Sequence, residues 1–209
     1  MPQNPTQQIG PSMEKPATEL NRAEIKRKLL HLLALGIPFS IAYLTRPTAV
    51  YIFVSLAAAM AAGELLRQKI DFLQKLFLAL FGTFVRPEEK TRFTGATYLF
   101  IAGAVCLVLF DMPIAYTVIG FMIVGDAAAA LVGMQFGRIR ISSGKSLEGT
   151  LACICTCLLF WALFPKLDFH MALAAAVLTG ILEIIPQRIN DNLIVPVVCG
   201  LVLQSWMGW

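Results

Sequence analysis

The chain has 209 residues, of which 57% are hydrophobic and 14% are charged, and its formal net charge at pH 7 is +4. Soluble globular domains are about 45–50% apolar and about 25% charged, so the composition excludes an ordinary soluble domain and favours an integral membrane protein. The modest net charge does not favour binding to nucleic acid.

The chain begins with a polar segment. Residues 1–24 are rich in Pro, Gln, Thr and Glu and lack both an apolar core and a small-residue cleavage site. We expect a disordered cytoplasmic tail rather than a signal peptide, followed by a single membrane domain over residues 25–209. Apolar stretches near the lower length limit of about 17–20 residues predict about seven transmembrane helices. These stretches are residues 29–44, 48–66, 95–110, 113–132, 149–164, 171–185 and 193–206.

One further segment is amphipathic. Residues 71–85 are apolar on one side and carry Asp71, Gln74 and Lys75 on the other. A helix with this pattern lies in the membrane interface. The predicted fold is therefore all-α, a polytopic bundle of about seven transmembrane helices plus one interfacial helix.

The distribution of basic residues predicts the orientation. With the N-terminus in the cytoplasm, only Arg46 and Lys166 of the 17 basic residues fall on the outer side. Short cytoplasmic segments of membrane proteins carry an excess of Lys and Arg. We expect a multi-pass protein of the inner (cytoplasmic) membrane, with its active site facing the cytoplasm.

The fourth predicted span contains Asp126 within an apolar run. A central Asp costs about 2.5–3.5 kcal/mol on insertion scales, so an ionised Asp126 needs a cation, a metal or a water-filled cleft. Gly133 and Gly137 lie near the same helical face. Close helix packing is an alternative explanation for the glycines, but it does not explain Asp126.

The loop after this span, residues 137–146, contains Gly, Lys and Ser in an order that suggests a phosphate-binding loop. We reject that motif, because the spacing of its glycines is wrong and the preceding element is a membrane helix instead of a strand. Lys145 still offers a point charge for phosphate. A helix is expected to begin at about Ser146, where free amides favour an anion, although Ser146 as a simple helix cap is the alternative.

Oxygen-bearing side chains gather near the last two spans. Glu183 lies near the cytoplasmic end of the sixth span, and Asn190, Asp191 and Asn192 follow it. Such hard oxygen ligands suit Mg²⁺, so together with Asp126 they suggest a metal–nucleotide site. An ordinary polar turn is the alternative.

Further candidates lie near the first two spans. Arg27 and Lys28 precede the first span, and His31 lies on the same helical face. Glu64 ends the second span and forms an i, i+3 pair with Arg67. Taken alone, these residues fit topological charge and local pairing.

Taken together, these pieces resemble the family of CTP-dependent kinases of polyprenol, dolichol, phytol and diacylglycerol, over about residues 24–206. The resemblance implies transfer of the γ-phosphate of CTP to the hydroxyl of a membrane lipid alcohol, with Mg²⁺ as cofactor and the bilayer as surroundings. The matching residues are Arg27, Lys28 and His31; Glu64; Thr94 to Tyr98; Gly125, Asp126, Gly133 and Gly137; Lys145, Ser146, Glu148 and Gly149; and Glu183, Asn190, Asp191, Asn192 and Pro196.

The resemblance also suggests roles, with alternatives left open. Asp126 with Asn190 or Asp191 is expected to hold Mg²⁺, and Lys145 with Arg27 or Lys28 to stabilise the transferring phosphate. Glu148 or Glu183 either orients the lipid hydroxyl or supports a lysine. The expected catalytic residues are Asp126, Lys145, Glu148 and Glu183; the nucleotide-binding residues are Arg27, Lys28, Gly133, Gly137, Ser146 and Asn190; the metal ligands are Asp126, Asp191 and Asn192; and His31 and Glu64 are further candidates.

Two other functions compete with a kinase. A phosphatidate cytidylyltransferase would also use CTP and Mg²⁺, but the chain lacks the His-Gly-Gly segment and the second acidic cluster of that family. A small transporter or assembly subunit would place ionisable groups along the whole membrane depth, whereas here they gather at one side.

Overall fold

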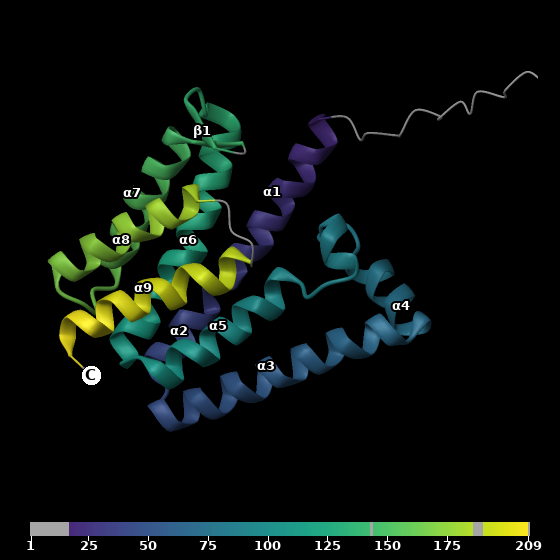
Figure 1. Ribbon diagram of the computed structural model, residues 1–209, viewed down its shortest axis with the longest axis horizontal. Helices are drawn as coiled ribbons and strands as arrows, with labels where there is room; N and C mark the ends of the chain where they lie inside the picture. Colours follow the sequence, from purple (N-terminus) through teal and green to yellow (C-terminus); the bar gives the residue numbers. More distant parts are fainter. Residues whose placement is uncertain (1–16, 143, 186–189, 209) are drawn as a thin grey trace, which may run out of the picture.

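A computed structural model describes residues 17–142, 144–185 and 190–208. Within these ranges the chain is a bundle of helices, which confirms the all-α class. A short antiparallel hairpin that the sequence did not predict, β1 (Arg140–Ser142) with β2 (Lys145–Ser146), joins two of them. The helices are α1 (Ala17–Leu33), α2 (Gly36–Tyr43), α3 (Arg46–Lys69), α4 (Asp71–Phe81), the 3₁₀ turn η1 (Pro87–Lys90), α5 (Gly95–Leu109), α6 (Met112–Phe136), α7 (Leu147–Leu163), α8 (Phe169–Ile184) and α9 (Asp191–Met207) (Figure 1).

Helix α6 is the centre of the bundle. Helices α1, α2, α5, α7, α8 and α9 all pack against it, while α3 packs mainly on α5 at one side (Figure 1). Every residue from Ile114 to Gly125 is buried, which is typical of a helix that is apolar on all sides. Asp126 follows this buried stretch directly, so a rigid apolar core holds the part of α6 that carries it.

Two described helices, α3 and α6, are long and apolar enough to cross a membrane. With 25 residues, α6 is about 37 Å long at about 1.5 Å per residue, more than the roughly 30 Å hydrocarbon core. Helices α5, α7, α8 and α9 are apolar but have 17 residues or fewer. By length and hydropathy, the described helices therefore include fewer clear spans than the seven or so predicted. The count of seven remains a prediction.

The N-terminal boundaries differ from the prediction. Helix α1 begins at Ala17, so residues 17–24 of the expected tail are helical, and residues 1–16 lie outside the described ranges. The expected span over residues 29–44 is broken between α1 and α2. There the amide of Ala34 donates to the carbonyl of His31 at 2.9 Å, a 3₁₀-type bond that ends α1.

Helix α4 agrees with the predicted amphipathic segment over residues 71–81. It contains no buried residue, and it leaves Phe72, Leu76 and Leu80 exposed. Its polar Gln74 turns toward the following loop, where it donates to the carbonyl of Lys90 at 2.9 Å. The location of α4 in a membrane interface remains a prediction.

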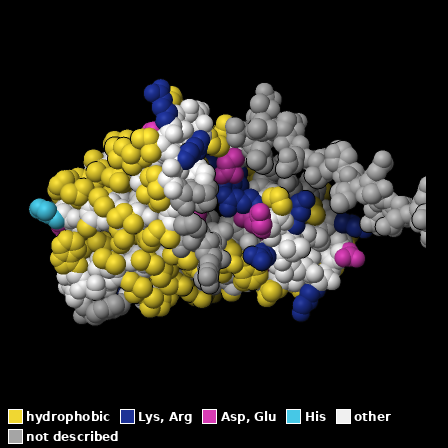
Figure 2. Space-filling view, turned by 45° about the horizontal axis from the view of Figure 1, so that its top comes forward, with side chains coloured by type: hydrophobic (Ala, Val, Ile, Leu, Met, Phe, Trp, Pro, Cys, Tyr) yellow, Lys and Arg dark blue, Asp and Glu magenta, His cyan; other side chains and the backbone are white. Residues whose placement is uncertain are grey.

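The surface is divided by polarity. Figure 2 shows apolar side chains covering one half of the visible face, while Lys, Arg, Asp and Glu gather in the other half. The ion pair of Arg46 with Asp111, at 3.7 Å, joins the start of α3 to the start of α6, the end of α6 away from Asp126. This division matches a bundle whose apolar part is covered by lipid.

Arg67 holds a buried polar network at the end of α3. Its guanidinium donates to Oε2 of Glu64 at 2.7 Å and to the carbonyls of Glu89, Arg92 and Lys90 at 2.9, 2.9 and 3.0 Å. The side chains of Arg67 and Glu64 are only 5% and 6% exposed. The network therefore ties the loop around η1 to α3.

Glu64 extends this network to α5. Its Oε1 accepts from the hydroxyls of Thr94 at 2.7 Å and Thr97 at 3.0 Å, and Thr94 caps the N-terminus of α5. Asn192 of α9 donates its amide to the carbonyl of Gly95 at 2.9 Å. The contacts fix the ends of α3, α5 and α9 relative to one another.

We expect Arg67→Met to lower the free energy of unfolding by about 3–5 kcal/mol, because Glu64 would remain as a buried charge without its partner. Denaturant unfolding of the purified protein in detergent measures this loss. Arg92→Met removes an exposed guanidinium and should change stability by less than about 0.5 kcal/mol. Equal stability of the two variants would contradict the structural role of Arg67.

Candidate functional site

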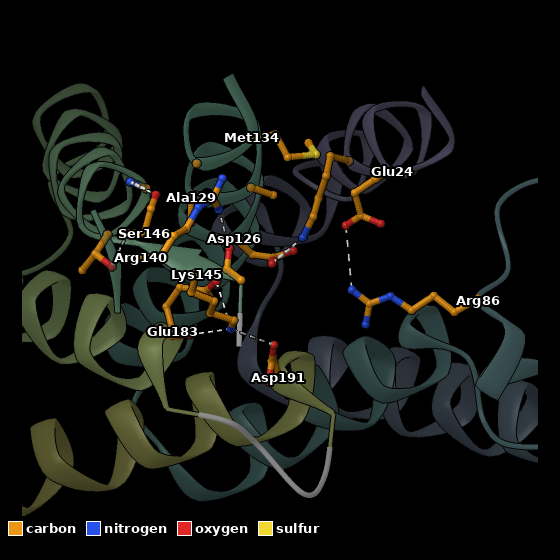
Figure 3. A pocket seen from close by; sticks show the side chains of 16 residues that line it. Glu24, Arg86, Asp126, Ala129, Met134, Arg140, Lys145, Ser146, Glu183 and Asp191 are labelled. Carbon is orange, nitrogen blue, oxygen red and sulfur yellow. Dashed lines mark hydrogen bonds and ion pairs between the residues drawn. The ribbon is translucent and has the colours of Figure 1, made fainter. Parts of the chain in front are cut away.

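A cavity of about 200 Å³ lies at the end of α6, enclosed by α1, the hairpin, the start of α7, the end of α8 and the start of α9 (Figure 3). Charged side chains from segments far apart in the sequence converge on it. The residues that line it are Glu24, Lys28, Arg86, Asp126, Ala129, Ala130, Gly133, Met134, Arg140, Gly144, Lys145, Ser146, Gly149, Thr150, Glu183 and Asp191.

Asp126 and Lys28 form an ion pair on one wall of the cavity. Lys28 Nζ of α1 donates to Oδ1 of Asp126, and its side chain is 4% exposed. One turn further along α1, Nε2 of His31 lies 3.6 Å from Oδ2 of Asp126 and has no hydrogen-bond partner among the described residues. Asp126 thus has the cationic partner that its position in an apolar helix requires.

Lys145 is the second cation of the cavity. Its Nζ lies 3.0 Å from Oε1 of Glu183 and 3.5 Å from Oδ2 of Asp191, and it also donates to the carbonyl of Glu183. Burial alone would lower the pKa of Lys145, but the two carboxylates outweigh it and raise the pKa above its ordinary value. Lys145 is therefore protonated at neutral pH.

The cavity floor combines the carboxylates of Asp126, Glu183 and Asp191 with the ammonium groups of Lys28 and Lys145. The ammonium groups suit phosphate, and the carboxylate oxygens suit a hard cation. Among the described residues, no three His, Cys, Asp or Glu side chains form a ready-made metal cluster. Mg²⁺ bound with nucleotide phosphates needs only one or two carboxylates, so this donor set fits it.

Glycines bring α6 and α7 close together beside the cavity. A Cβ atom on Gly149 would lie 2.7 Å from the carbonyl of Ala129, and one on Gly133 would lie 3.2 Å from Oγ of Ser146. A Cβ on Gly137 would lie 2.7 Å from the same Oγ. Ser146 caps α7 by accepting from the amide of Gly149 at 3.1 Å. Close packing thus accounts for Gly137, whereas Gly133 also lines the cavity.

Glu148 lies beside the cavity without lining it. Its carboxylate accepts from the amide of Ile139 at 3.2 and 3.3 Å, which holds the hairpin against α7. Hydrogen bonds from its own amide and from that of Ile139 lower the pKa of Glu148. Of the two glutamates expected to orient the lipid hydroxyl, only Glu183 lines the cavity.

Four other expected site residues also lie off the cavity wall. Arg27 pairs with Glu24, and Glu64 belongs to the Arg67 network. Asn190 caps α9 by accepting from the amide of Asn192 at 3.0 Å, and the amide group of Asn192 contacts α5. The structure gives these residues positioning contacts, and their functional roles remain predictions. The expected residues that do line the cavity are Lys28, Asp126, Gly133, Lys145, Ser146, Glu183 and Asp191.

Three charged residues of the wall were not expected from the sequence. Glu24 lies in the segment expected to be a disordered tail, and neither Arg86 nor Arg140 is among the expected site residues. For Glu24, the sequence offers one signal: its i, i+3 spacing with Arg27 is typical of a helical ion pair and indicates that α1 begins before residue 25.

Curated proteins that are similar to this chain include three lipid kinases. No family model and no solved structure matches the chain. The chain is 25% identical to CTP-dependent diacylglycerol kinase 1 of Schizosaccharomyces pombe over 163 residues, which cover 69% of this chain and 75% of that protein. It is 28% identical to the phytol kinase of Synechocystis sp. over 207 residues, which cover 90% of this chain and 81% of that protein. A stretch of 109 residues, 47% of this chain, is 33% identical to the dolichol kinase of Saccharomyces cerevisiae but covers 20% of that protein.

The fold and the cavity define a helical protein with an ion-lined site at one end of an apolar bundle. These three relatives are lipid kinases, and they confirm the resemblance to the lipid-kinase family that the sequence motifs indicate.

Proposed function

We propose that this protein is a CTP-dependent kinase that transfers the γ-phosphate to the hydroxyl of a membrane lipid alcohol, a polyprenol, dolichol, phytol or diacylglycerol. One observation carries the proposal: Lys28, Lys145, Asp126, Glu183 and Asp191 converge on one cavity at the end of an apolar bundle. Phosphoryl transfer requires aligned oxygens and neutralised charge more than covalent help from the protein, and these side chains offer both.

Phosphate binding requires an exchange of partners. Lys28 turns from Asp126, and Lys145 from Asp191, to the phosphate oxygens, and the freed Asp126 and Asp191 would hold Mg²⁺. Lys145 keeps its contact with Glu183. When bound, Mg²⁺ neutralises charge on the triphosphate. The carboxylates thus keep the lysines in place before the nucleotide binds, so that little ordering is needed when it does.

Glu183 is proposed to accept the proton of the lipid hydroxyl. The hydroxyl oxygen forms a bond to the γ-phosphorus as the bond from that phosphorus to the β-phosphate oxygen breaks, and CDP leaves. Lys145, 3.0 Å from Oε1 of Glu183, orients the carboxylate toward the cavity. The small side chains of Ala129 and Ala130 leave space on the wall for the lipid headgroup.

The size of the cavity indicates which part of the nucleotide it encloses. Its volume of about 200 Å³ is below the roughly 300–1,000 Å³ of most ligand pockets. It suits the triphosphate, while the ribose and the base extend beyond the lysines toward the rim. CTP specificity must then arise from side chains at that rim.

We place the site at the cytoplasmic face of the inner membrane in a multi-pass protein whose N-terminus is cytoplasmic. The concentration of basic residues in segments of one predicted side supports this orientation. The nucleotide is a cytoplasmic compound that does not cross a bilayer, which requires the same orientation.

Membrane vesicles test the function and the orientation in one assay. CTP added to inverted vesicles with a panel of lipid alcohols should yield a lipid monophosphate and CDP, whereas sealed right-side-out vesicles should yield neither. A CDP-lipid with pyrophosphate would indicate a cytidylyltransferase and would contradict the proposal. So would the absence of any phosphorylated lipid from purified, folded protein.

A further inference from the structure

Glu24 and Arg86 form the side of the cavity away from Lys145 (Figure 3). Nη2 of Arg86 lies 3.8 Å from Oε1 of Glu24, and the two side chains are 47% and 28% exposed. One comes from α1 and the other from the loop before η1. A negative and a positive group thus stand side by side at the rim, where a ligand can reach both.

Each group is held in place without using all of its hydrogen-bonding capacity. Arg27 Nε donates to Oε2 of Glu24 at 3.0 Å and Arg27 Nη2 donates to Oε1, so each carboxylate oxygen keeps room for a further donor. Although burial would raise the pKa of Glu24, Arg27 lowers it. Glu24 is therefore an ionised acceptor at neutral pH. The amide of Arg86 donates to Oε2 of Glu89 at 2.9 Å, while Oε1 of Glu89 accepts from the amide of Gly95 at 2.8 Å. Among the described residues, the Arg86 guanidinium itself makes only the loose ion pair with Glu24.

This pair matches the edge of one pyrimidine base. Cytosine presents two acceptors, O2 and N3, beside a donor, the N4 amino group. A guanidinium donates to O2 and N3, and an adjacent carboxylate accepts from N4. Uracil reverses the last two positions, because its N3 carries a hydrogen and its O4 is an acceptor. A carboxylate would then face O4, which is repulsive.

The other charged group of the rim is less suited to this role. Arg140 Nη1 donates to the carbonyl of Gly144 at 2.6 Å within the hairpin, so its guanidinium is partly engaged. In the described part of the chain, Arg140 forms no ion pair with an acid. Of the charged groups described at the rim, Glu24 and Arg86 stand together as an acceptor and a donor.

We propose that Arg86 and Glu24 read the base of the donor nucleotide and select cytosine over uracil. The inference rests on the proposed use of CTP. It assigns Lys28 and Lys145 to the phosphates, and Glu24 and Arg86 to the base. The cavity can then be smaller than a whole nucleotide, because the base lies at its rim.

The test compares kcat/KM for CTP and UTP in lipid phosphorylation. The wild type should prefer CTP, and Glu24→Gln should lower the CTP/UTP ratio at least about tenfold, because an amide can offer O4 a donor. Arg86→Gln should lower kcat/KM for CTP more than for UTP. Glu88→Gln, at an exposed position of η1, removes the same charge as Glu24→Gln and should leave the ratio unchanged.

The outcomes separate this inference from the proposed function. If the wild type makes lipid monophosphate but Glu24→Gln keeps the wild-type ratio, the base assignment is overturned and the kinase activity stands. A wild type that uses CTP and UTP equally also overturns it. If no nucleotide supports lipid phosphorylation, the proposed function itself fails. If Glu24→Gln is folded but inactive, nucleotide binding is measured instead, as the rise in melting temperature that CTP or UTP causes. A variant that CTP still stabilises more than UTP, as in the wild type, overturns the inference.

Discussion

Asp126→Asn is expected to lower kcat/KM for lipid phosphorylation by about 10³-fold or more. Asn has the shape of Asp but lacks the charge that pairs with Lys28 and that would hold Mg²⁺ on the triphosphate. Loss of a single preorganised electrostatic contact costs about 10²–10³-fold in other active sites, and Asp126 is proposed to make more than one. Steady-state assays of purified protein in detergent with CTP and a lipid alcohol measure the effect.

The control for this variant must separate chemistry from folding. Asp126→Asn leaves Lys28, a buried lysine, without its counter-ion, which destabilises by up to about 3–5 kcal/mol. Combining it with Lys28→Met removes both charges and should restore stability without restoring turnover. Asp111→Asn, at the other end of α6, should keep wild-type activity. Turnover near the wild-type level in either Asp126 variant would refute the role given to this carboxylate.

Lys145→Met should lower kcat/KM by about 10²–10³-fold, because it removes a charge-assisted donor to the transferring phosphate. Since the carboxylates of Glu183 and Asp191 raise the pKa of Lys145, this lysine stays protonated as pH rises through neutrality. The activity of the wild type should therefore show no loss near neutral pH from titration of Lys145. Kinetic assays over a range of CTP concentrations measure the change.

The matched control for Lys145→Met is Lys166→Met, which removes an ammonium group from the loop between α7 and α8. This variant should keep wild-type kinetics. Comparable losses in both variants would indicate a general effect of charge and would contradict a specific contact between Lys145 and phosphate.

The parts of the fold that the sequence predicts best are those with a strong local signal. The long apolar runs predict α3 and α6, and the amphipathic pattern predicts α4, because one helix alone determines each pattern. The break between α1 and α2 has no such signal. It comes from tight turns at Ala34 and Leu35, in a run that is apolar on both sides of the break.

The same distinction applies to the site. Asp126 stands out because a carboxylate in an apolar helix is costly, and the sequence therefore predicts it as functional. Its pairing with Lys28 depends on tertiary packing and was not predicted. The pairing of Lys145 with Glu183 was expected only as one alternative, the support of a lysine by Glu148 or Glu183. Glu24 and Arg86 are separated by a long stretch of sequence, in polar segments where charges are common, so only the folded bundle brings them together.

Labelled CTP tests most directly whether the cavity transfers the terminal phosphate to lipid. The purified protein is given CTP labelled with ³²P at either the γ or the α position, together with a lipid alcohol and Mg²⁺, and the lipid is extracted and counted. We predict label in the lipid from γ-labelled CTP alone, and none with Asp126→Asn. Lipid that gains label from α-labelled CTP, or from neither, would contradict a kinase.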